Sequence, residues 1–192
     1  MHQKIDLNYS DKSKIVSVIN GDCNELLQSI NGKQWYAEKW RGVIFLDPYA
    51  MGLDWGSLEK ISKTQAFDVW YLFPFSAVNR NLRNNGKIPQ ANEVKLNKIF
   101  GSDEWKNEIY AESTQMTLFG QPDIEKIPGG LKSFIVKRLM DTFPKVATNP
   151  AILKNANKSP LFLLCFAVSN HSKAAQDLAI RGANNILKHT ED

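Results

Sequence analysis

The sequence is poor in the residues that build disulfide frameworks and metal centres. Its 192 residues include two cysteines, Cys23 and Cys165, and three histidines, with no Cys-x-x-Cys pair. Both cysteines stand among apolar neighbours, so we expect two buried free thiols in a reducing compartment. The sequence therefore predicts neither a disulfide-stabilised domain nor a zinc site, and we assign no metal ligands.

Long apolar runs and a large excess of one charge are also missing. No uncharged stretch approaches the roughly 18 residues that a membrane-spanning helix needs, and residues 1–6 form no apolar signal region. We therefore predict a soluble, cytoplasmic protein that makes no membrane contact. The 24 basic and 20 acidic residues leave a net charge of +4. This charge permits contact with nucleic acid but does not indicate it.

What the sequence does contain is a series of short strands and amphipathic helices. Residues 15–19 are mostly β-branched and predict a strand. Asp22 follows, with Glu25 three residues later, a pattern typical of a helix N-terminus. Apolar residues then recur at helical spacing up to Ile30. The chain therefore begins with a strand, a turn and a helix.

The next segment predicts a βαβ unit. Residues 43–46 form a continuous apolar run, typical of a strand covered on both faces. Residues 57–64 predict a short helix, and residues 67–73 predict another strand, ended by Pro74. Such a unit requires a parallel sheet, in which ligands bind beyond the carboxyl ends of the strands. These ends are residues 20–22, 47–49 and 74–77.

The remaining residues complete a single predicted α/β domain over residues 1–192. Residues 79–125 are polar, and we interpret them as an insertion that covers the site as a lid. A helix follows at 131–139, and residues 143–152 and 161–168 predict an antiparallel hairpin. A last helix has one apolar face, made of Ala175, Leu178, Ala179, Gly182, Ala183 and Ile186.

The tripeptide Asp47-Pro48-Tyr49 is the group most indicative of chemistry. The carboxylate, or a carbonyl beside the proline, can accept hydrogen bonds from an amino group and so direct the nitrogen lone pair toward a methyl donor. The aromatic ring can stack on a planar substrate. Amino methyltransferases have a similar motif, Asp/Asn-Pro-Pro-Tyr/Phe, with one more proline. Taken alone, a proline that simply ends a buried strand explains the tripeptide at least as well.

The surrounding segments resemble the three-Cys-motif partner family, TcmP. Residues 45–49 are similar to the Phe-Leu-Asp-Pro-Tyr-Gly segment of the family, with Ala50 in place of the glycine. Residues 68–74 are similar to its Asp-x-Trp-x-Leu-Phe-Pro strand. The resemblance runs from about Ile15 to the C-terminus and so covers the middle and C-terminal part of the family. Further matching segments are Trp55, residues 78–80, residues 99–101, Trp105 and residues 160–167.

The resemblance implies a Rossmann-like fold of the S-adenosylmethionine (SAM)-dependent methyltransferase type, with SAM as cofactor. It also implies a partner protein that bears three cysteines and is similar to radical-SAM proteins. Asp47, Pro48 and Tyr49 would form the catalytic acceptor site. Asp22 would receive the adenine amino group of the cofactor, although a helix cap explains this residue equally well. The residues expected to bind substrate are Trp55, Asn79 and Arg80.

The glycine-rich cofactor loop of the family, Asp-Gly-Phe-Ala-Gly-Pro-Gly, is missing from this sequence. Residues 15–19 correspond to the third strand of the implied fold, and the first two strands have no counterpart. One edge of strand 43–46 is then left bare, which favours association with another chain. Truncation is the preferred explanation, ahead of a second chain that supplies the missing half or a rearranged sheet. We expect the isolated chain to bind SAM weakly and to be inactive.

Two other functions stay open. The chain can be a non-catalytic module that docks on the three-Cys-motif partner or on nucleic acid. A metal-dependent phosphate-ester enzyme that uses Asp22, Asp47 and Asp54 has little support, because no recognised spacing connects these acids. Asp68, an acidic residue in an apolar strand, is expected to be paired, to lie near a strand edge or to have a shifted pKa.

Overall fold

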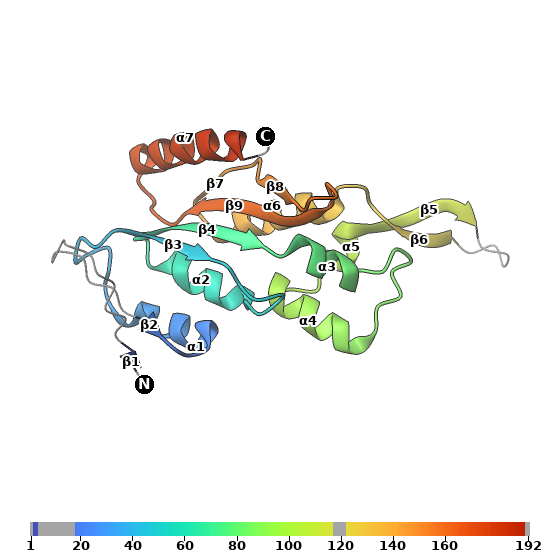
Figure 1. The fold of residues 1–192 in the computed structure, drawn as a ribbon, viewed down its shortest axis with the longest axis horizontal. Coiled ribbons are helices and arrows are strands. Elements are labelled where there is room, and N and C mark those ends of the chain that lie inside the picture. Colours follow the sequence, from blue (N-terminus) through green and yellow to red (C-terminus); the bar gives the residue numbers. More distant parts are fainter. Residues whose placement is uncertain (1, 4–17, 117–121, 191–192) are drawn as a thin grey trace.

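The centre of the structure is a mixed β-sheet (Figure 1). The computed structural model describes residues 2–3, 18–116 and 122–190. Within them, five strands form the sheet in the order β3-β4-β9-β7, and β8 also pairs with β9. β3 and β4 run parallel, whereas β4, β7 and β8 run antiparallel to β9. The strands are β3 (Gly42–Leu46), β4 (Phe67–Phe73), β7 (Lys145–Val146), β8 (Ala151–Lys154) and β9 (Pro160–Val168).

The predicted βαβ unit is confirmed. The helix α2 (Trp55–Lys63) joins β3 to β4, and the two strands pair with Phe45 beside Trp70. Both strands consist largely of β-branched and aromatic residues, which favour a pleated backbone. Pro74 ends β4, as predicted, and occupies the N-cap position of α3 (Phe75–Asn81). A proline is tolerated there because the N–H groups at a helix start have no partner within the helix.

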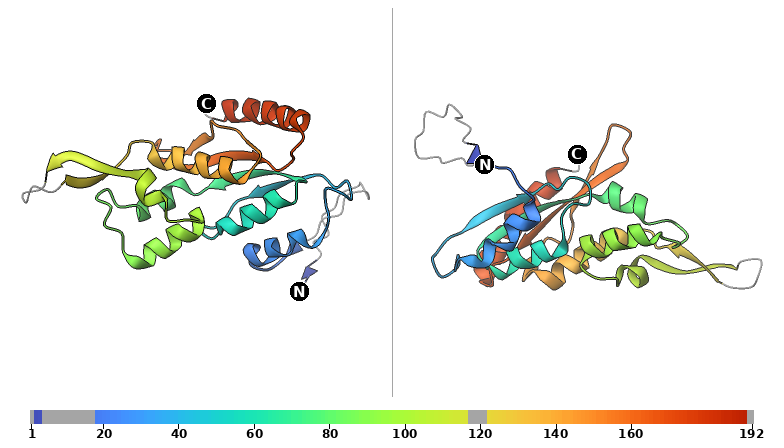
Figure 2. Two further views of the ribbon diagram at one scale, coloured as in Figure 1. Left: turned by 180° about the vertical axis from the view of Figure 1, so that it is seen from behind. Right: turned by 90° about the horizontal axis from the view of Figure 1, so that it is seen from below.

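Helices cover the two faces of the sheet unequally (Figures 1 and 2). Alternate residues of β4, namely Val69, Tyr71 and Phe73, face a large core that α2, α4 and α6 complete. The opposite face, with Phe166 and Val168 of β9, packs against α7. None of the helices in the described ranges combines the length and hydropathy needed to cross a bilayer. The bounds are α4 (Gln90–Phe100), α6 (Gly130–Thr142) and α7 (Lys173–His189).

The predicted C-terminal hairpin is confirmed as β8 and β9. The side chain of Asn155 closes its turn, because Oδ1 accepts the N–H groups of Asn157 and Ser159. The segment 143–152, predicted as one strand, is divided into β7 and β8. Pro150 lies directly before β8 and has no N–H for a ladder hydrogen bond, which accounts for the interruption.

The last helix, α7, is confirmed, but its buried face is not the predicted one. Ala183 and Leu187 are buried and Ala179 packs partly against the sheet. Leu178 and Ile186, which were predicted to face the core, are exposed. α7 packs mainly against β7 and β9, so a narrow apolar stripe is sufficient. Apolar periodicity in the sequence did not determine the rotation of this helix about its axis.

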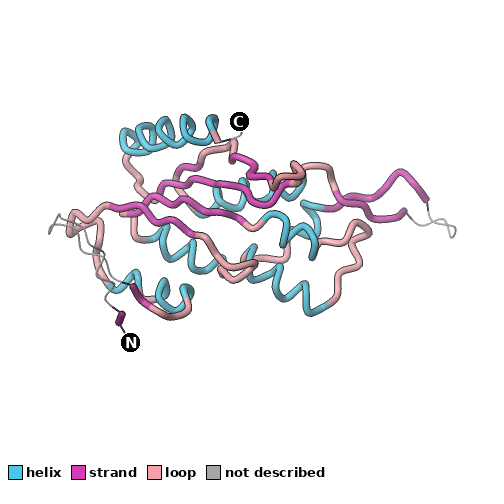
Figure 3. Tube along the Cα trace, viewed as in Figure 1, coloured by secondary structure: helices cyan, strands magenta, loops and turns pink. Residues whose placement is uncertain are grey.

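The segment 79–125, predicted as a lid, contributes largely to the core. Leu96, Ile99 and Phe100 of α4 are fully buried, as is Trp105 at the start of α5 (Trp105–Ile109). The segment continues as a two-stranded ribbon that extends away from the central sheet (Figure 3). The helices of this segment are thus part of the main core, and its interpretation as a lid stays a prediction. The ribbon strands are β5 (Tyr110–Met116) and β6 (Pro122–Lys126).

The N-terminal elements lie apart from the central sheet. β2 (Val18–Ile19) pairs with β1 (His2–Gln3) and not with the parallel strands. The rest of the predicted strand, residues 15–17, lies outside the described residues. α1 (Cys23–Gln28) is followed by the short helix η1 (Ile30–Gly32). Cys23 is exposed on α1, contrary to prediction, because this helix turns little more than Leu27 toward the core.

The strand β3 forms one edge of the sheet in the part of the chain that the structure describes, as the sequence predicted. Its predicted coverage on both faces is wrong. Ile44 and Leu46 turn toward the main core, whereas Val43 and Phe45 on the other face are 64% and 60% exposed. The cause is the position of α7, which lies over β9 and β7 and leaves β3 uncovered.

The close contact between Gly101 and Trp55 generates a test of the core. Gly101 ends α4 in the left-handed conformation, with φ of 69°, and a Cβ atom there would lie 2.6 Å from Cδ1 of Trp55. We predict that Gly101→Ala lowers the free energy of unfolding by about 3 kcal/mol or more, because backbone strain and overpacking add. Gly129 has φ of 75° with nothing within 4 Å of its Cβ position. Gly129→Ala should cost about 1 kcal/mol. Urea denaturation measures the free energy of unfolding of both variants. Equal losses would contradict the close contact between Gly101 and Trp55.

Candidate functional site

A cavity of about 460 Å³ lies at the carboxyl ends of β3 and β4. The two strands run parallel, so their ends meet at the same edge of the sheet. The residues that follow β3 and β4 therefore form opposite sides of one opening. The lining residues are Asp47, Pro48, Tyr49, Ala50, Pro74, Ser76, Ala77, Arg80, Leu161 and Phe162.

The predicted acceptor residues lie together in this cavity. Asp47 directly follows β3 and is exposed, and Pro48 ends the strand. Tyr49 is 96% exposed, so its ring is open to a planar molecule. Ala50, in the left-handed region with φ of 49°, then reverses the chain. The site thus presents a carboxylate beside an open aromatic ring.

Arg80 is brought into the same cavity by α3. Its Nη1 donates a hydrogen bond of 2.9 Å to the hydroxyl of Ser76, one helical turn earlier. This bond holds the guanidinium along the helix, next to the residues that follow β4. Leu161 and Phe162 of β9 supply the apolar part of the lining. The cavity combines one anionic, one cationic and several apolar groups.

Asn24, on α1, fixes the loop that carries the acceptor residues. Its Nδ2 donates to the carbonyl of Gly52 over 2.8 Å. Its Oδ1 accepts the N–H of Asp54 and the hydroxyl of Ser57, each at 2.9 Å. This residue was not among those predicted from the sequence. The one feature of the sequence that could have indicated its role is that Asn24 is the single amide side chain in the first turn of a predicted amphipathic helix.

Asp22 lies outside this cavity. Its carboxylate caps α1 by accepting the N–H groups of Asn24 at 2.7 Å and Glu25 at 3.3 Å. The cap prediction is confirmed, and the cofactor role stays a prediction. Asp22, Asp47 and Asp54 form no metal-binding group, and the described ranges contain no cluster of three or more His, Cys, Asp or Glu side chains suited to a metal.

Trp55 does not line the cavity, contrary to the expectation that it walls the substrate site. It is the first residue of α2 and is 1% exposed in the main core. Its indole Nε1 donates to the hydroxyl of Thr142 over 3.1 Å, and the guanidinium of Arg138 lies over its ring. The helix begins two residues before the predicted range of 57–64, and this earlier start turns Trp55 inward.

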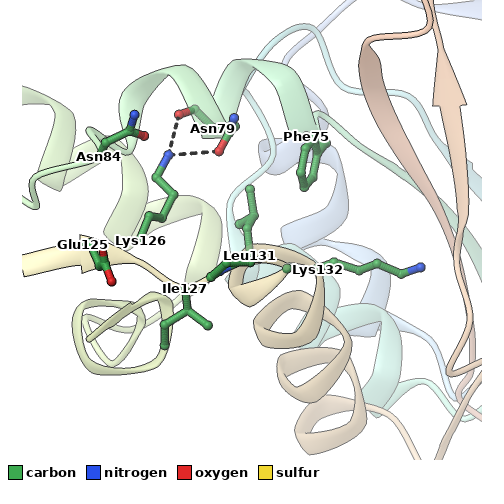
Figure 4. Close-up of a pocket in the computed structure, with 10 residues that line it drawn as sticks. Phe75, Asn79, Asn84, Glu125, Lys126, Ile127, Leu131 and Lys132 are labelled. Atoms are coloured by element: carbon green, nitrogen blue, oxygen red, sulfur yellow. Dashed lines mark hydrogen bonds between the residues drawn. The ribbon is translucent and has the colours of Figure 1, made fainter. Parts of the chain in front are cut away.

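Asn79 belongs to a second cavity, also of about 460 Å³ (Figure 4). There Lys126 Nζ donates to the side-chain oxygen of Asn79 at 3.0 Å and to its backbone carbonyl at 3.3 Å. Partial burial lowers the pKa of the Lys126 ammonium group. Asn79 and Arg80 were predicted to act together, but successive helical residues point about 100° apart and so face different cavities.

Cys165 and Asp68 lie along the sheet rather than in a cavity. Cys165 is buried, as predicted, and burial raises the pKa of its thiol to about 12, so the thiol is unreactive. Asp68 makes no salt bridge in the described parts of the chain. Burial instead raises the pKa of its carboxyl group. Of the three expectations for Asp68, the shifted pKa is found.

Comparisons with known proteins add no relative. The chain matches no protein-family model, no curated protein and no solved structure. The geometry of the site and the sequence resemblance are therefore the basis for a functional proposal.

We predict that Asn24→Ala lowers the free energy of unfolding by about 2 kcal/mol, because three hydrogen-bonding groups lose their partner. Asn107→Ala removes an exposed asparagine from α5 and should change stability by less than about 0.5 kcal/mol. Chemical denaturation of the two variants measures these values. A loss no larger for Asn24 than for Asn107 would show that the amide does not hold the loop.

The raised pKa of Asp68 predicts a pH dependence of stability. A raised pKa in the folded state means that the charged carboxylate destabilises the fold above that pKa and that the penalty disappears as the group binds a proton. Asp68→Asn should therefore raise the melting temperature at pH 7, and its advantage should shrink as the pH falls toward 4. The exposed Asp103 provides the control, Asp103→Asn. An advantage that grows on acidification would contradict the assignment.

Proposed function

We propose that this chain is the acceptor-binding part of a SAM-dependent methyltransferase-like protein of the TcmP type, acting on an amino group of a planar molecule. The observation that carries the proposal is the cavity in which Asp47, Pro48 and Tyr49 stand beside Arg80. Asp47, Pro48 and Tyr49 resemble the amino methyltransferase motif, with one proline fewer, and stand at the strand end where ligands of parallel sheets bind.

Each side chain has a distinct part in binding such an acceptor. The Asp47 carboxylate accepts hydrogen bonds from the amino group and holds its orientation. The exposed ring of Tyr49 stacks on the planar part of the molecule. Arg80 attracts a phosphate or carboxylate on the same ligand. Leu161 and Phe162 exclude water from one side.

The described residues do not fit SAM. The glycine-rich loop that would let the backbone approach the cofactor is missing from the sequence. Both backbone hydrogen bonds to the Asp22 carboxylate end on Oδ1, so the cap by itself is compatible with an adenine amino group, and the misfit rests on the missing loop. The methyl donor would therefore need a site made by other residues, and we propose that this chain alone binds an acceptor without transferring a methyl group.

A second candidate function is a non-catalytic module that docks on a three-Cys-motif protein or on nucleic acid. The exposed apolar residues Val43 and Phe45 on a sheet edge favour it, because such edges pair readily with other chains. This function needs no ligand in the cavity, and ligand binding therefore separates the two candidates.

The test uses adenosine 5′-monophosphate, which has a planar base, an amino group and a phosphate, and inosine 5′-monophosphate, which lacks the amino group. We expect the amino ligand to bind more tightly and Asp47→Ala to abolish the preference. Tyr49→Ala should weaken both ligands by about tenfold through lost stacking. Tyr36→Ala, which removes another exposed tyrosine, should have no effect. Isothermal titration measures the affinities.

Two results would contradict the proposal. Equal binding of the two nucleotides, or none, would exclude the acceptor role and favour the docking module. A saturable rise in melting temperature with SAM or its demethylated product would show that a cofactor site exists on this chain after all.

A further inference from the structure

The uncovered face of β3 has a chemically self-complementary order. Arg41, Val43, Phe45 and Asp47 alternate with the period of a strand and so share one face, in the order basic, apolar, apolar, acidic. All four side chains are exposed. Neither Arg41 nor Asp47 forms a salt bridge in the described residues. Among the described residues, Arg41 donates hydrogen bonds to the backbone carbonyls of Tyr36 and Trp40 and lies over the ring of Tyr36.

The outer edge of β3 also has backbone groups that can pair with another strand. Gly42 donates its N–H to the carbonyl of Ala66, just before β4, so the even-numbered residues of β3 point their polar groups toward β4. The N–H and C=O groups of Val43 and Phe45 consequently point to the opposite edge. No strand in the described ranges pairs with that edge.

We propose that β3 of a second copy of this chain pairs antiparallel with this edge, about a two-fold axis at Ile44. In this register Val43 of each copy lies opposite Phe45 of the other, an aromatic and β-branched pair that stabilises sheets. Arg41 of each copy lies opposite Asp47 of the other. The outward backbone groups of Val43 and Phe45 then exchange about four hydrogen bonds.

Other registers pair the same side chains less favourably. An axis at Phe45 sets Val43 opposite Asp47 and leaves Arg41 beyond the strand, opposite Tyr49. An axis at Val43 sets Arg41 opposite Phe45. In a parallel arrangement through the same edge, the exposed faces of the two strands would point to opposite sides of the sheet, so Arg41 could not meet Asp47 of the other copy. The Ile44-centred antiparallel register therefore satisfies both the charges and the apolar residues, which favours a second copy over an unrelated strand.

The pairing has a consequence for the cavity at the end of β3. Arg41 of the second copy would stand next to Asp47, at the edge of the opening that Tyr49 also borders. Each cavity would then be bounded by residues of two chains. The inference rests on β3 alone and stands whether or not the cavity binds an amino acceptor.

Sedimentation equilibrium of the full chain tests the dimer. We expect a concentration-dependent dimer whose dissociation constant rises at least about a hundredfold in Phe45→Lys, because a charge replaces the central apolar contact. Leu178→Lys, on the exposed face of α7, should leave it unchanged. Arg41→Asp should weaken the dimer about tenfold through like charges, and adding Asp47→Arg in the same chain should restore it.

Disulfide formation tests the register independently of affinity. In a Cys23→Ser background, chains with Val43→Cys and chains with Phe45→Cys, carrying tags of different length, should form a mixed disulfide when combined and oxidised. Directly opposed residues lie about 5.5 Å apart between Cα atoms, whereas two copies of Val43 lie on a diagonal at about 7–8 Å, too far for a bridge.

Three results would overturn the proposal. One is a wild-type chain that stays monomeric up to about 1 mM, where even weak interfaces associate. Another is a dimer that Phe45→Lys leaves intact. The third is Val43→Cys alone crosslinking as efficiently as the mixture, because this would require a different register.

Discussion

The parallel pairing of β3 with β4 is the constraint on which the rest of the structure depends. Because the two strands run in the same direction, α2 must carry the chain back along one face, and its apolar side seals the main core. The same pairing brings both strands to an end at one edge, where Pro48 and Pro74 turn the chain outward. The cavity follows directly, since its two sides are the residues after each strand.

Much of this arrangement was accessible from sequence because it depends on local patterns. The strand at 67–73, the helix near 131–139 and the hairpin at the C-terminus follow from apolar runs, prolines and turn residues. The sharing of one cavity by Asp47 and Arg80 was partly accessible, because the ends of parallel strands meet at one edge, but the turn of α3 decides that Arg80 and not Asn79 faces it. Asn24 was not, since its partners lie about 30 residues away and the contact requires the docked position of α1. The rotation of α7 and the burial of Trp55 likewise depend on what each helix packs against.

The uneven coverage of the sheet separates two kinds of surface. The face toward α2, α4 and α6 holds a continuous aromatic cluster in which Phe100 contacts Phe73, Trp105 and Phe134. The face toward α7 is protected over β9 and open over β3. The closely packed aromatic cluster on the first face tolerates few changes in side-chain volume. The uncovered face of β3 tolerates many substitutions. Substitutions that change the association of the protein with other chains can therefore arise there without loss of the fold.

The anchoring of the acceptor loop by Asn24 has a dynamic consequence. α1 has no buried residue and packs mainly against α2, so little apolar surface opposes its detachment from that helix. Proteins open locally with free energies far below that of global unfolding where such contacts are few. Each transient release of α1 would free the carbonyl of Gly52 and the N–H of Asp54 together. The order of the loop from Asp47 to Asp54 is thus governed by the docking equilibrium of one short helix, and amide exchange in the two segments should proceed in a single opening event.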